Sequence, residues 1–324
     1  MDMKGTDLLK RDNSKKAVVL MRLVPMFGLI FVVLLFAILT RGVLFEPKNI
    51  RNIIDQAFLV MVMSMGAAFV VAHGGMDLSV GAVVTVDSIL IGALLDRGIS
   101  AAPAILLALA VALAGALVVG GTHVFLGIPV FLTSLAVSYI LRGLGENHMA
   151  AKTMVYTPVS FNTLFNQWWL KLVFLILMFA LSWYLFNRTV LGKYQRALGG
   201  NPVVAALSGV NVKKYIILSH VIAAVCASMA SVFSVARTGM VQATAGAGLE
   251  MDVIVALVLG GMPLSGGEKS RISAAVIGAV TVTVLKNGLT LVGANVSSVE
   301  GITGVLFIIC VAASLKRRPG EVIK

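Results

Sequence analysis

Charged side chains are scarce in this 324-residue chain: they make up 12% of it, whereas hydrophobic residues make up 59%. A typical soluble domain has about 25% charged residues, and a soluble fold of this length cannot bury so much apolar surface. The composition therefore excludes an ordinary soluble protein and predicts an integral membrane protein. The apolar runs are continuous and lack the alternation of barrel strands, so we expect an all-α membrane fold.

Cysteine is nearly absent, and recognisable catalytic motifs are missing. Cys226 and Cys310 lie inside apolar runs, which predicts buried thiols and argues against a disulfide framework. No His, Cys or carboxylate cluster has metal-ligand spacing, and no nucleophile–base pair is apparent, so an intramembrane enzyme is not expected. The stretch LSGGEKS (264–270) resembles a phosphate-binding loop but lacks the required spacing, so we expect this chain to bind no cofactor or metal.

Ten apolar segments predict about ten transmembrane helices, of which the third and the eighth are short. Their approximate ranges are 23–40, 54–72, 79–95, 103–121, 128–144, 168–187, 215–236, 249–262, 272–289 and 299–315. If the N-terminus is cytosolic, 17 of the 26 basic residues fall on the cytosolic side and 9 on the other. The positive-inside rule then places both termini in the cytosol.

This orientation also accounts for the net charge of +12 better than nucleic-acid binding does. We expect one transmembrane domain over residues 23–315, between cytosolic tails at 1–22 and 316–324. The segment 188–214 would be a cytosolic excursion from this domain.

Two nearly identical octets interrupt the apolar pattern: GGMDLSVG at Gly74–Gly81 and GGMPLSGG at Gly260–Gly267. Paired glycines release a helix and permit positive φ, whereas Asp, Ser and similar side chains cap the helix that follows. Irregular backbone at membrane depth is tolerated only inside protein or beside a water-filled cavity, and broken helices are typical of transporters. Two tight loops at the membrane surface remain the alternative interpretation.

Polar residues in or beside these breaks are the candidates for a solute path or gate. Asp77, Ser79 and Ser265 are expected to cap the following helices, and Asp87 either lines a cavity or pairs with His73 or a neighbouring subunit. Helix packing is the alternative role for the polar residues within spans, and Glu250 and Asp252 are interpreted as structural residues at a helix start. The full candidate set for the path or gate is His73, Gly74, Gly75, Asp77, Ser79, Asp87, Thr133, Ser134, Gly260, Gly261 and Ser265.

The segment YQRALGGNPVVAALSGVNVKKY predicts one short cytosolic helix between two sharp turns. Asn201 suits its N-cap, Pro202 its first turn and Gly209 its C-terminal cap. Such a projecting helix suits a groove on a partner protein, or alternatively the anionic lipid surface. The candidate contact residues are Arg196, Gly199, Gly200, Asn201, Pro202, Ala205, Ala206, Ser208 and Gly209.

Five stretches of the chain resemble, in order, the permease subunits of bacterial sugar ABC importers of the ribose/xylose/galactose group. They are HGGMDLSVGAVV, IPVFLTSLAVSYILRGL, YQRALGGNPVVAALSGVNV, GLEMDVIVALVLGGMPLSGG and LKNGLTLVGAN. The sequence departs from the family pattern at Met262, Pro263, Lys269 and Asp87, which leaves the substrate open.

The resemblance implies a location in the bacterial inner membrane and a set of partners. These are a cytosolic ATPase that uses ATP, a second permease copy or paralogue, and an external sugar-binding protein. It also implies that a coupling helix at about Pro202–Ser208 sits in a cleft of the ATPase. The alternatives are an ABC permease for a nucleoside or branched-chain amino acid, a proton- or sodium-coupled transporter that uses Asp77, Asp87 and His73, and a membrane scaffold.

Overall fold

The computed structural model describes residues 23–149 and 154–314, and in this part the chain is almost entirely helical. The predicted tails at 1–22 and 316–324 lie outside the described residues. The first half contains a helix at Leu23–Leu39, η1 (Val43–Phe45), α2 (Pro47–Ala72), α3 (Ser79–Asp96), α4 (Ala101–Leu126), α5 (Val130–Met149), β1 (Val155–Tyr156), α6 (Val159–Phe165) and α7 (Trp168–Asn187). The second half contains α8 (Val190–Gly200), α9 (Pro202–Leu207), α10 (Val212–Thr238), β2 (Met240–Val241), α11 (Leu249–Leu259), α12 (Ser273–Leu291) and α13 (Val296–Ser314).

Six of the described helices are long and apolar enough to cross a membrane: α2, α3, α4, α7, α10 and α12. Leu23–Leu39 and Val296–Ile309 are shorter apolar helices. The chain is therefore a multi-pass helical membrane protein, as expected. The short eighth helix is confirmed, because α11 has only 11 residues and cannot cross a bilayer of about 30 Å.

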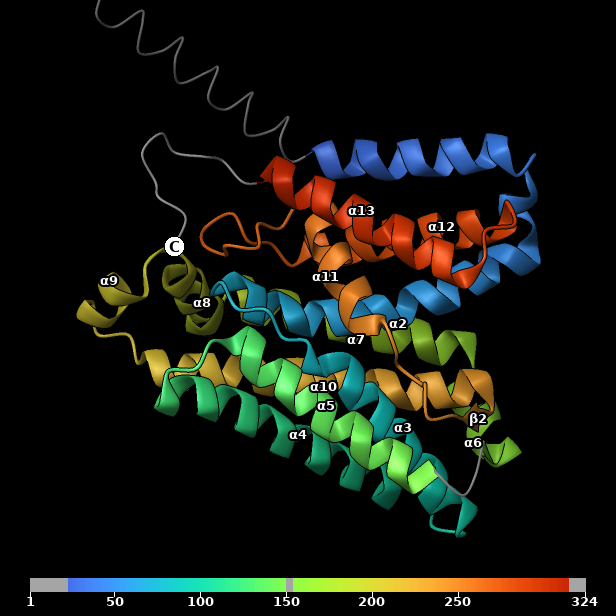
Figure 1. Cartoon of the computed structure of the whole chain (residues 1–324), viewed down its shortest axis with the longest axis horizontal. Helices are drawn as coiled ribbons and strands as arrows, with labels where there is room; N and C mark the ends of the chain where they lie inside the picture. The colour runs from blue at the N-terminus through green and yellow to red at the C-terminus, as the bar shows by residue number, and fades with distance from the viewer. Residues whose placement is uncertain (1–22, 150–153, 315–324) are drawn as a thin grey trace, which may run out of the picture.

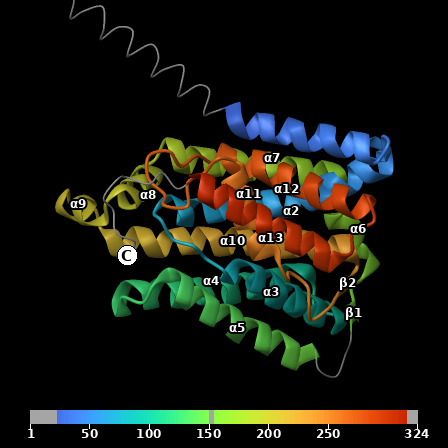
Figure 2. The same cartoon turned by 45° about the horizontal axis from the view of Figure 1, so that its top comes forward.

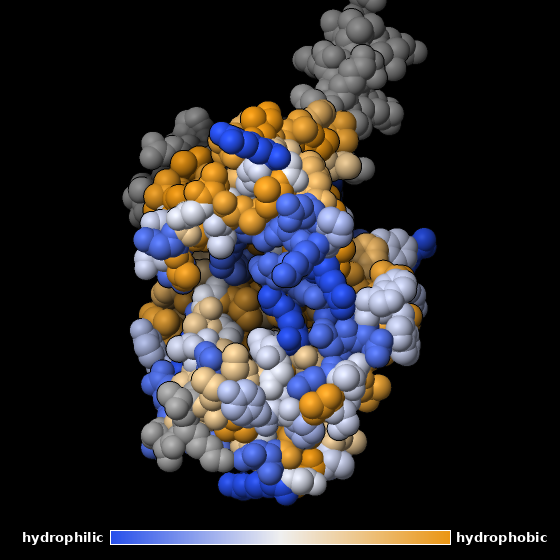
Figure 3. Space-filling model, turned by 90° about the vertical axis from the view of Figure 1, so that its right-hand side faces the viewer, coloured by the Kyte–Doolittle hydropathy of each residue, from blue (hydrophilic) through white to orange (hydrophobic). Residues whose placement is uncertain are grey.

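The long helices lie roughly alongside one another, and the elements outside them gather at the two ends (Figures 1 and 2). The projecting helix α9 marks one end, which we call the α9 end, and the strands β1 and β2 mark the opposite end, which we call the ribbon end. The strands pair antiparallel, Val155 with Val241 and Tyr156 with Met240, a feature that the helical prediction did not include. Figure 3 looks onto the ribbon end, where hydrophilic side chains gather near the middle of the face.

Helices α2 and α10 form the centre of the bundle and pack closely because small residues lie between them. A Cβ atom at Gly66 of α2 would lie 2.9 Å from the Ala223 Cα and 2.7 Å from the Cys226 Cβ of α10. Cys226 is buried and free, which confirms its predicted role as an apolar thiol. The peripheral helix α7, in contrast, is only 17% buried within its most apolar window, so most of its apolar surface faces outward.

Candidate functional site

The first octet forms a sharp break between α2 and α3. Helix α2 ends at Ala72, Gly74 has φ +86°, and α3 begins at Ser79. The buried Asp77 accepts hydrogen bonds from the Ser79 backbone N–H at 2.8 Å and from the Ser79 hydroxyl at 2.5 Å. Asp77 thus accepts the first backbone N–H of α3, as predicted for a residue that stabilises this helix start, although the N-cap position itself is Leu78, which makes no side-chain cap. Ser79 does not cap the helix, because it lies inside the first turn and donates to Asp77.

A buried hydrogen bond between side chains ties this break to α10. The second Asp77 oxygen, Oδ2, lies 2.6 Å from Nδ1 of His220, and both side chains are almost fully buried. His73 Nε2 lies 3.0 Å from the Ser219 hydroxyl, and the His73 and His220 rings meet edge-on with centroids 6.0 Å apart. The sequence reasoning missed His220, although an ionisable residue within an apolar span was itself a signal.

Helix α5 holds the same break from another side. The fully buried Ser134 hydroxyl accepts the Leu78 N–H at 3.1 Å and lies 3.1 Å from the Phe131 carbonyl. The Thr133 hydroxyl only bonds the Val130 carbonyl of its own turn, at 2.9 Å. Ser134 therefore satisfies a backbone donor that the helix break leaves open, whereas Thr133 makes no contact of this kind.

The second octet also leaves the helix, but it caps nothing. Positive φ occurs at Gly261, Gly266 and Gly267. Helix α12 begins only at Ser273, and its N-terminus has no side-chain cap within the part of the chain that the structure describes. The expectation that Ser265 caps the following helix is therefore wrong, because Ser265 lies in the long turn that precedes that helix.

The two octets contact each other directly. The Gly267 N–H donates to the Ala72 carbonyl at 2.9 Å, and a Cβ at Gly266 would lie 2.7 Å from the Gly74 nitrogen. Helix α8 completes this junction, because a Cβ at Gly199 would collide with both the Ala72 carbonyl oxygen and the Gly267 nitrogen. The ends of α2 and α8 and the second octet therefore meet backbone to backbone, and we call this contact the octet junction.

The short helix α9 projects from the junction at the α9 end (Figure 1). The Asn201 side chain caps it by accepting the Val203 and Val204 N–H groups at 3.0 and 3.2 Å, and Gly209 after it has φ +83°, so both predicted caps are confirmed. One correction concerns Gly199 and Gly200, which lie in the last turn of α8 and do not break the helix before Asn201. Helix α8 instead ends at Asn201, whose extended backbone separates α8 from α9.

The surface of α9 is apolar and exposed, except for Ala205. Val203, Val204 and Leu207 are 66%, 56% and 85% exposed, and Ala206 and Ser208 are also exposed. Ala205 is only 4% exposed and packs with Leu198 and Ile216. The sequence suggested equivalent roles for the two alanines, but the structure distinguishes them. Ala205 anchors α9 to its neighbours, and Ala206 faces outward.

Arg196 points back into the protein. Its guanidinium donates to the Phe186 carbonyl at 3.2 Å and lies 5.1 Å above the Phe186 ring. Arg196 therefore fastens α8 to the end of α7 and does not extend toward a partner.

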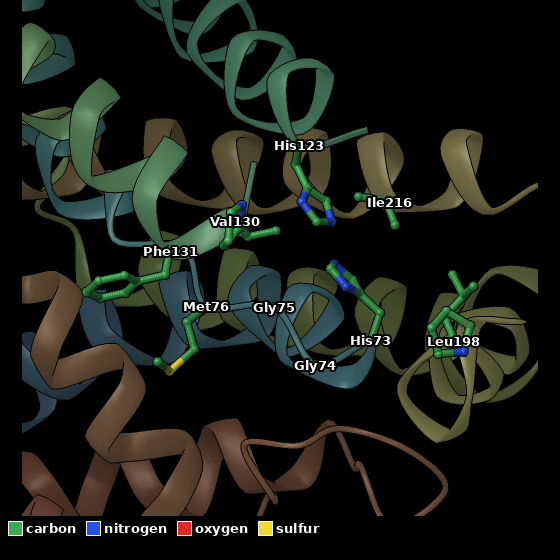
Figure 4. Close-up of a pocket in the computed structure, with 11 residues that line it drawn as sticks. His73, Gly74, Gly75, Met76, His123, Val130, Phe131, Leu198 and Ile216 are labelled. Atoms are coloured by element: carbon green, nitrogen blue, oxygen red, sulfur yellow. The ribbon is translucent and has the colours of Figure 1, made fainter. Parts of the chain in front are cut away.

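A cavity of about 380 Å³ lies beside the first octet (Figure 4). Its walls come from the octet, the α4–α5 turn, α8, α9 and α10, and include His73, His123, Leu198 and Ile216. His73 and His123 point toward one another across it (Figure 4). Of the predicted path residues, His73, Gly74 and Gly75 line this cavity, and Asp77 and Ser134 hold its wall in place.

Asp87 lies elsewhere, buried in α3 and fully shielded from solvent. Neither carboxylate oxygen has a hydrogen-bond partner within residues 23–149 and 154–314, and His73 bonds Ser219 instead. The expected pairing of Asp87 with His73 is therefore wrong, and Asp87 does not line this cavity.

A helical membrane protein with broken helices and a cavity beside one of the breaks has features typical of a solute permease. The chain belongs to the family described as branched-chain amino acid transport system / permease component, whose model matches residues 49–311.

Several similar proteins are also named as permeases. The chain is 34% identical over 272 residues to the ribose import permease protein RbsC of Escherichia coli, covering 78% of this chain and 80% of RbsC. It is 31% identical to RbsC of Bacillus subtilis, covering 92% and 94% of the two chains, and 30% identical to the D-allose transport system permease protein AlsC of E. coli, covering 82% of each. No solved structure matches significantly.

Proposed function

We propose that this chain is the membrane-spanning permease subunit of an ABC importer that passes a small neutral sugar across the bacterial inner membrane. Its relatives are permeases for ribose and D-allose, which supports a sugar over an amino acid as the solute. A separate ATPase supplies the energy, a second permease copy or paralogue completes the path, and an external binding protein delivers the solute. The chain itself holds no cofactor.

In this proposal the chain crosses the membrane ten times, and one of these crossings is made by the short helix α11 together with the irregular segment 242–248 that leads into it. Both termini and α8–α9 are cytosolic. The basic-residue bias along the chain supports this orientation. A cysteine at the highly exposed Leu207 should react with an impermeant thiol reagent only in inside-out vesicles. Reaction in intact cells would reverse the orientation.

The observation that carries the proposal is the route from α9 to the two breaks. An apolar helix tip that faces water is unfavourable unless a partner covers it, and α9 presents Val203, Val204 and Leu207 in this way. It is one residue away from α8, whose Gly199 lies against Ala72, at the end of α2 just before the first octet, and against Gly266 and Gly267 of the second octet. Movement of a partner that holds α9 would therefore reach both helix breaks, which is what alternating access requires.

The Ala206→Arg variant tests this function, because Ala206 is exposed whereas Ala205 is buried. We expect Ala206→Arg to fold normally but to lose the ATPase during co-purification, since bulk there blocks close packing with a partner. Val159→Arg, which changes a 74% exposed residue of α6 at the ribbon end, is the control and should retain the ATPase. Normal sugar uptake by Ala206→Arg would remove α9 from the mechanism.

A further inference from the structure

A second irregular segment reaches the interior of the bundle from the ribbon end. After β2 the chain turns back, and residues 242–248 run toward the middle of the molecule, where α11 begins (Figure 1). The Thr85 hydroxyl of α3 donates to the Ala245 carbonyl. A Cβ at Gly246 would lie only 3.0 Å from the Thr85 nitrogen. The start of α11 therefore packs against the first turns of α3, far from either end.

An ion pair lies at this place. Arg142 Nη2 of α5 donates to both carboxylate oxygens of Glu250, in the first turn of α11, at 2.9 and 3.0 Å. The carboxylate rests on Gly81 of α3, where an added Cβ would collide with it. Three helices thus hold Glu250 in one position.

The pair is accessible from outside the protomer. The side chains of Arg142 and Glu250 are 22% and 18% exposed. Tyr139, one turn before Arg142 on α5, is 70% exposed, and the neighbouring Ile140 is 60% exposed. Arg142 lies about 18 Å from the start of α5 and about 10 Å from its end, at 1.5 Å per residue.

Lipid cannot be the neighbour of this exposed pair. Charged side chains at membrane depth face the bundle interior or a water-filled cavity, because exposure to hydrocarbon is costly. If the pair served only to join α5 to α11, we would expect both side chains to be fully buried, with contact to neither water nor lipid. The partial exposure of the pair favours a water-filled surface, and so does the composition of α5, which is long enough to cross a membrane but is not among the six apolar spans.

We propose that Arg142 and Glu250 lie on the wall of the solute path and exchange hydrogen bonds with the hydroxyl groups of the passing sugar. Within the described residues Glu250 engages only Nη2 of Arg142, so the other guanidinium N–H groups can donate to hydroxyls, and the carboxylate can accept from them. The two charges compensate each other, which suits an uncharged polyol. This inference rests on the proposed function and adds the residues that contact the solute.

The first experiment tests whether water reaches the pair. In a variant whose two native cysteines are replaced by alanine, Tyr139→Cys is compared with Leu177→Cys on the peripheral helix α7, which is 62% exposed. A charged thiol reagent should modify Tyr139→Cys in the assembled transporter about tenfold faster or more, because only a hydrated thiol ionises readily. Equal, slow reaction at both positions would overturn the proposal.

The second experiment separates solute contact from a structural role. Arg142→Met combined with Glu250→Met removes both charges, and replacing an ion pair by apolar residues of similar size usually preserves stability. With D-ribose as the probe, we expect this folded double variant to carry about 10- to 100-fold less sugar per ATP hydrolysed, the range for lost hydrogen bonds to charged groups.

Two single variants refine the result. Gly81→Ala should lower the same ratio by displacing the Glu250 carboxylate, whereas Gly143→Ala, where a Cβ meets nothing within 4 Å, should leave it unchanged. Normal D-ribose uptake by the Met/Met variant would overturn the inference and leave the proposed function intact. If the unmodified transporter imports none of a panel of small neutral sugars that includes D-ribose, D-allose and D-fructose, the proposed function itself is overturned; if it imports another sugar of the panel, the Met/Met variant is tested with that sugar.

Discussion

The two octets share six of eight residues, yet the chain follows different courses through them. In the first, Asp77 caps α3 and the helix resumes at Ser79; in the second, the equivalent position is Pro263, and no helix resumes until Ser273. The octets also differ at their seventh position, which is Val80 in the first and Gly266 in the second. Val80 lies within helix α3, whereas Gly266 has φ +69°. Two substitutions thus separate a helix restart from a long turn, and a backbone contact still joins the two octets.

The two octets also differ in what stabilises them. The first depends on side chains from three helices: Asp77 with His220 of α10, Ser134 of α5 and the start of α3. The second depends on glycine backbone that lies against Ala72 and Gly74. We therefore expect the first to be sensitive to lost polar groups and the second to added atoms.

The largest effect is expected for Asp77→Leu, which leaves the His220 Nδ1 and the Ser79 N–H buried without partners. Each unsatisfied buried group costs about 1–3 kcal/mol, so thermal unfolding should occur at a clearly lower temperature and transport should be lost. Asp77→Asn, which can still cap the helix, should be milder.

Asp87→Leu, the same substitution ten positions further along and within α3, is the matched control. Its carboxylate makes no hydrogen bond within the described residues, so its removal should preserve or raise stability. An equal loss of stability in Asp77→Leu and Asp87→Leu would contradict the assignment of Asp77 as the cap.

The second octet should respond to a single methyl group. Gly266→Ala places a Cβ against the Ala72 carbonyl and also forces alanine to positive φ, which alone costs about 1–2 kcal/mol. Gly293→Ala has φ +90° but open space, so it measures the conformational cost alone. Thermal unfolding of the two variants should show the larger loss for Gly266→Ala, and equal losses would mean that the octets do not touch.

A smaller effect is expected for Ser134→Ala, which removes the acceptor of the Leu78 N–H. The loss should be about 1 kcal/mol. Thr133→Val should change stability less, because the Thr133 hydroxyl bonds only its own turn. The reverse order in thermal unfolding would show that α5 does not hold the first octet through Ser134.

Local sequence rules predicted a large part of this architecture. Apolar runs located the helices, and the caps at Asp77, Asn201 and Gly209 follow from side-chain and glycine chemistry within a few residues. Local rules failed at Ser265, where no helix follows at once, and at α8, where Gly199 and Gly200 remain helical. Of these two glycines, only Gly199 has the backbone of other segments packed against it.

The long-range contacts lay beyond such rules. Asp77 and His220 are 143 positions apart, and Gly199 meets Ala72 and Gly267 only after folding. The burial of Ala205 beside an exposed Ala206 likewise depends on Leu198 and Ile216. Sequence periodicity carries no information about which residues from distant segments meet.

The central claim is that α8 transmits movement of α9 to both octets through close backbone contact at Gly199. The most direct measurement is the amount of sugar carried per ATP hydrolysed by the reconstituted importer with Gly199→Ala or with Gly200→Ala. A Cβ at Gly199 collides with Ala72, at the end of α2 before the first octet, and with Gly267 of the second octet, whereas one at Gly200 meets nothing within 4 Å. We predict that Gly199→Ala lowers this ratio about tenfold, equivalent to about 1.4 kcal/mol, and that Gly200→Ala matches the unmodified protein. Equal ratios for the two variants would contradict the account.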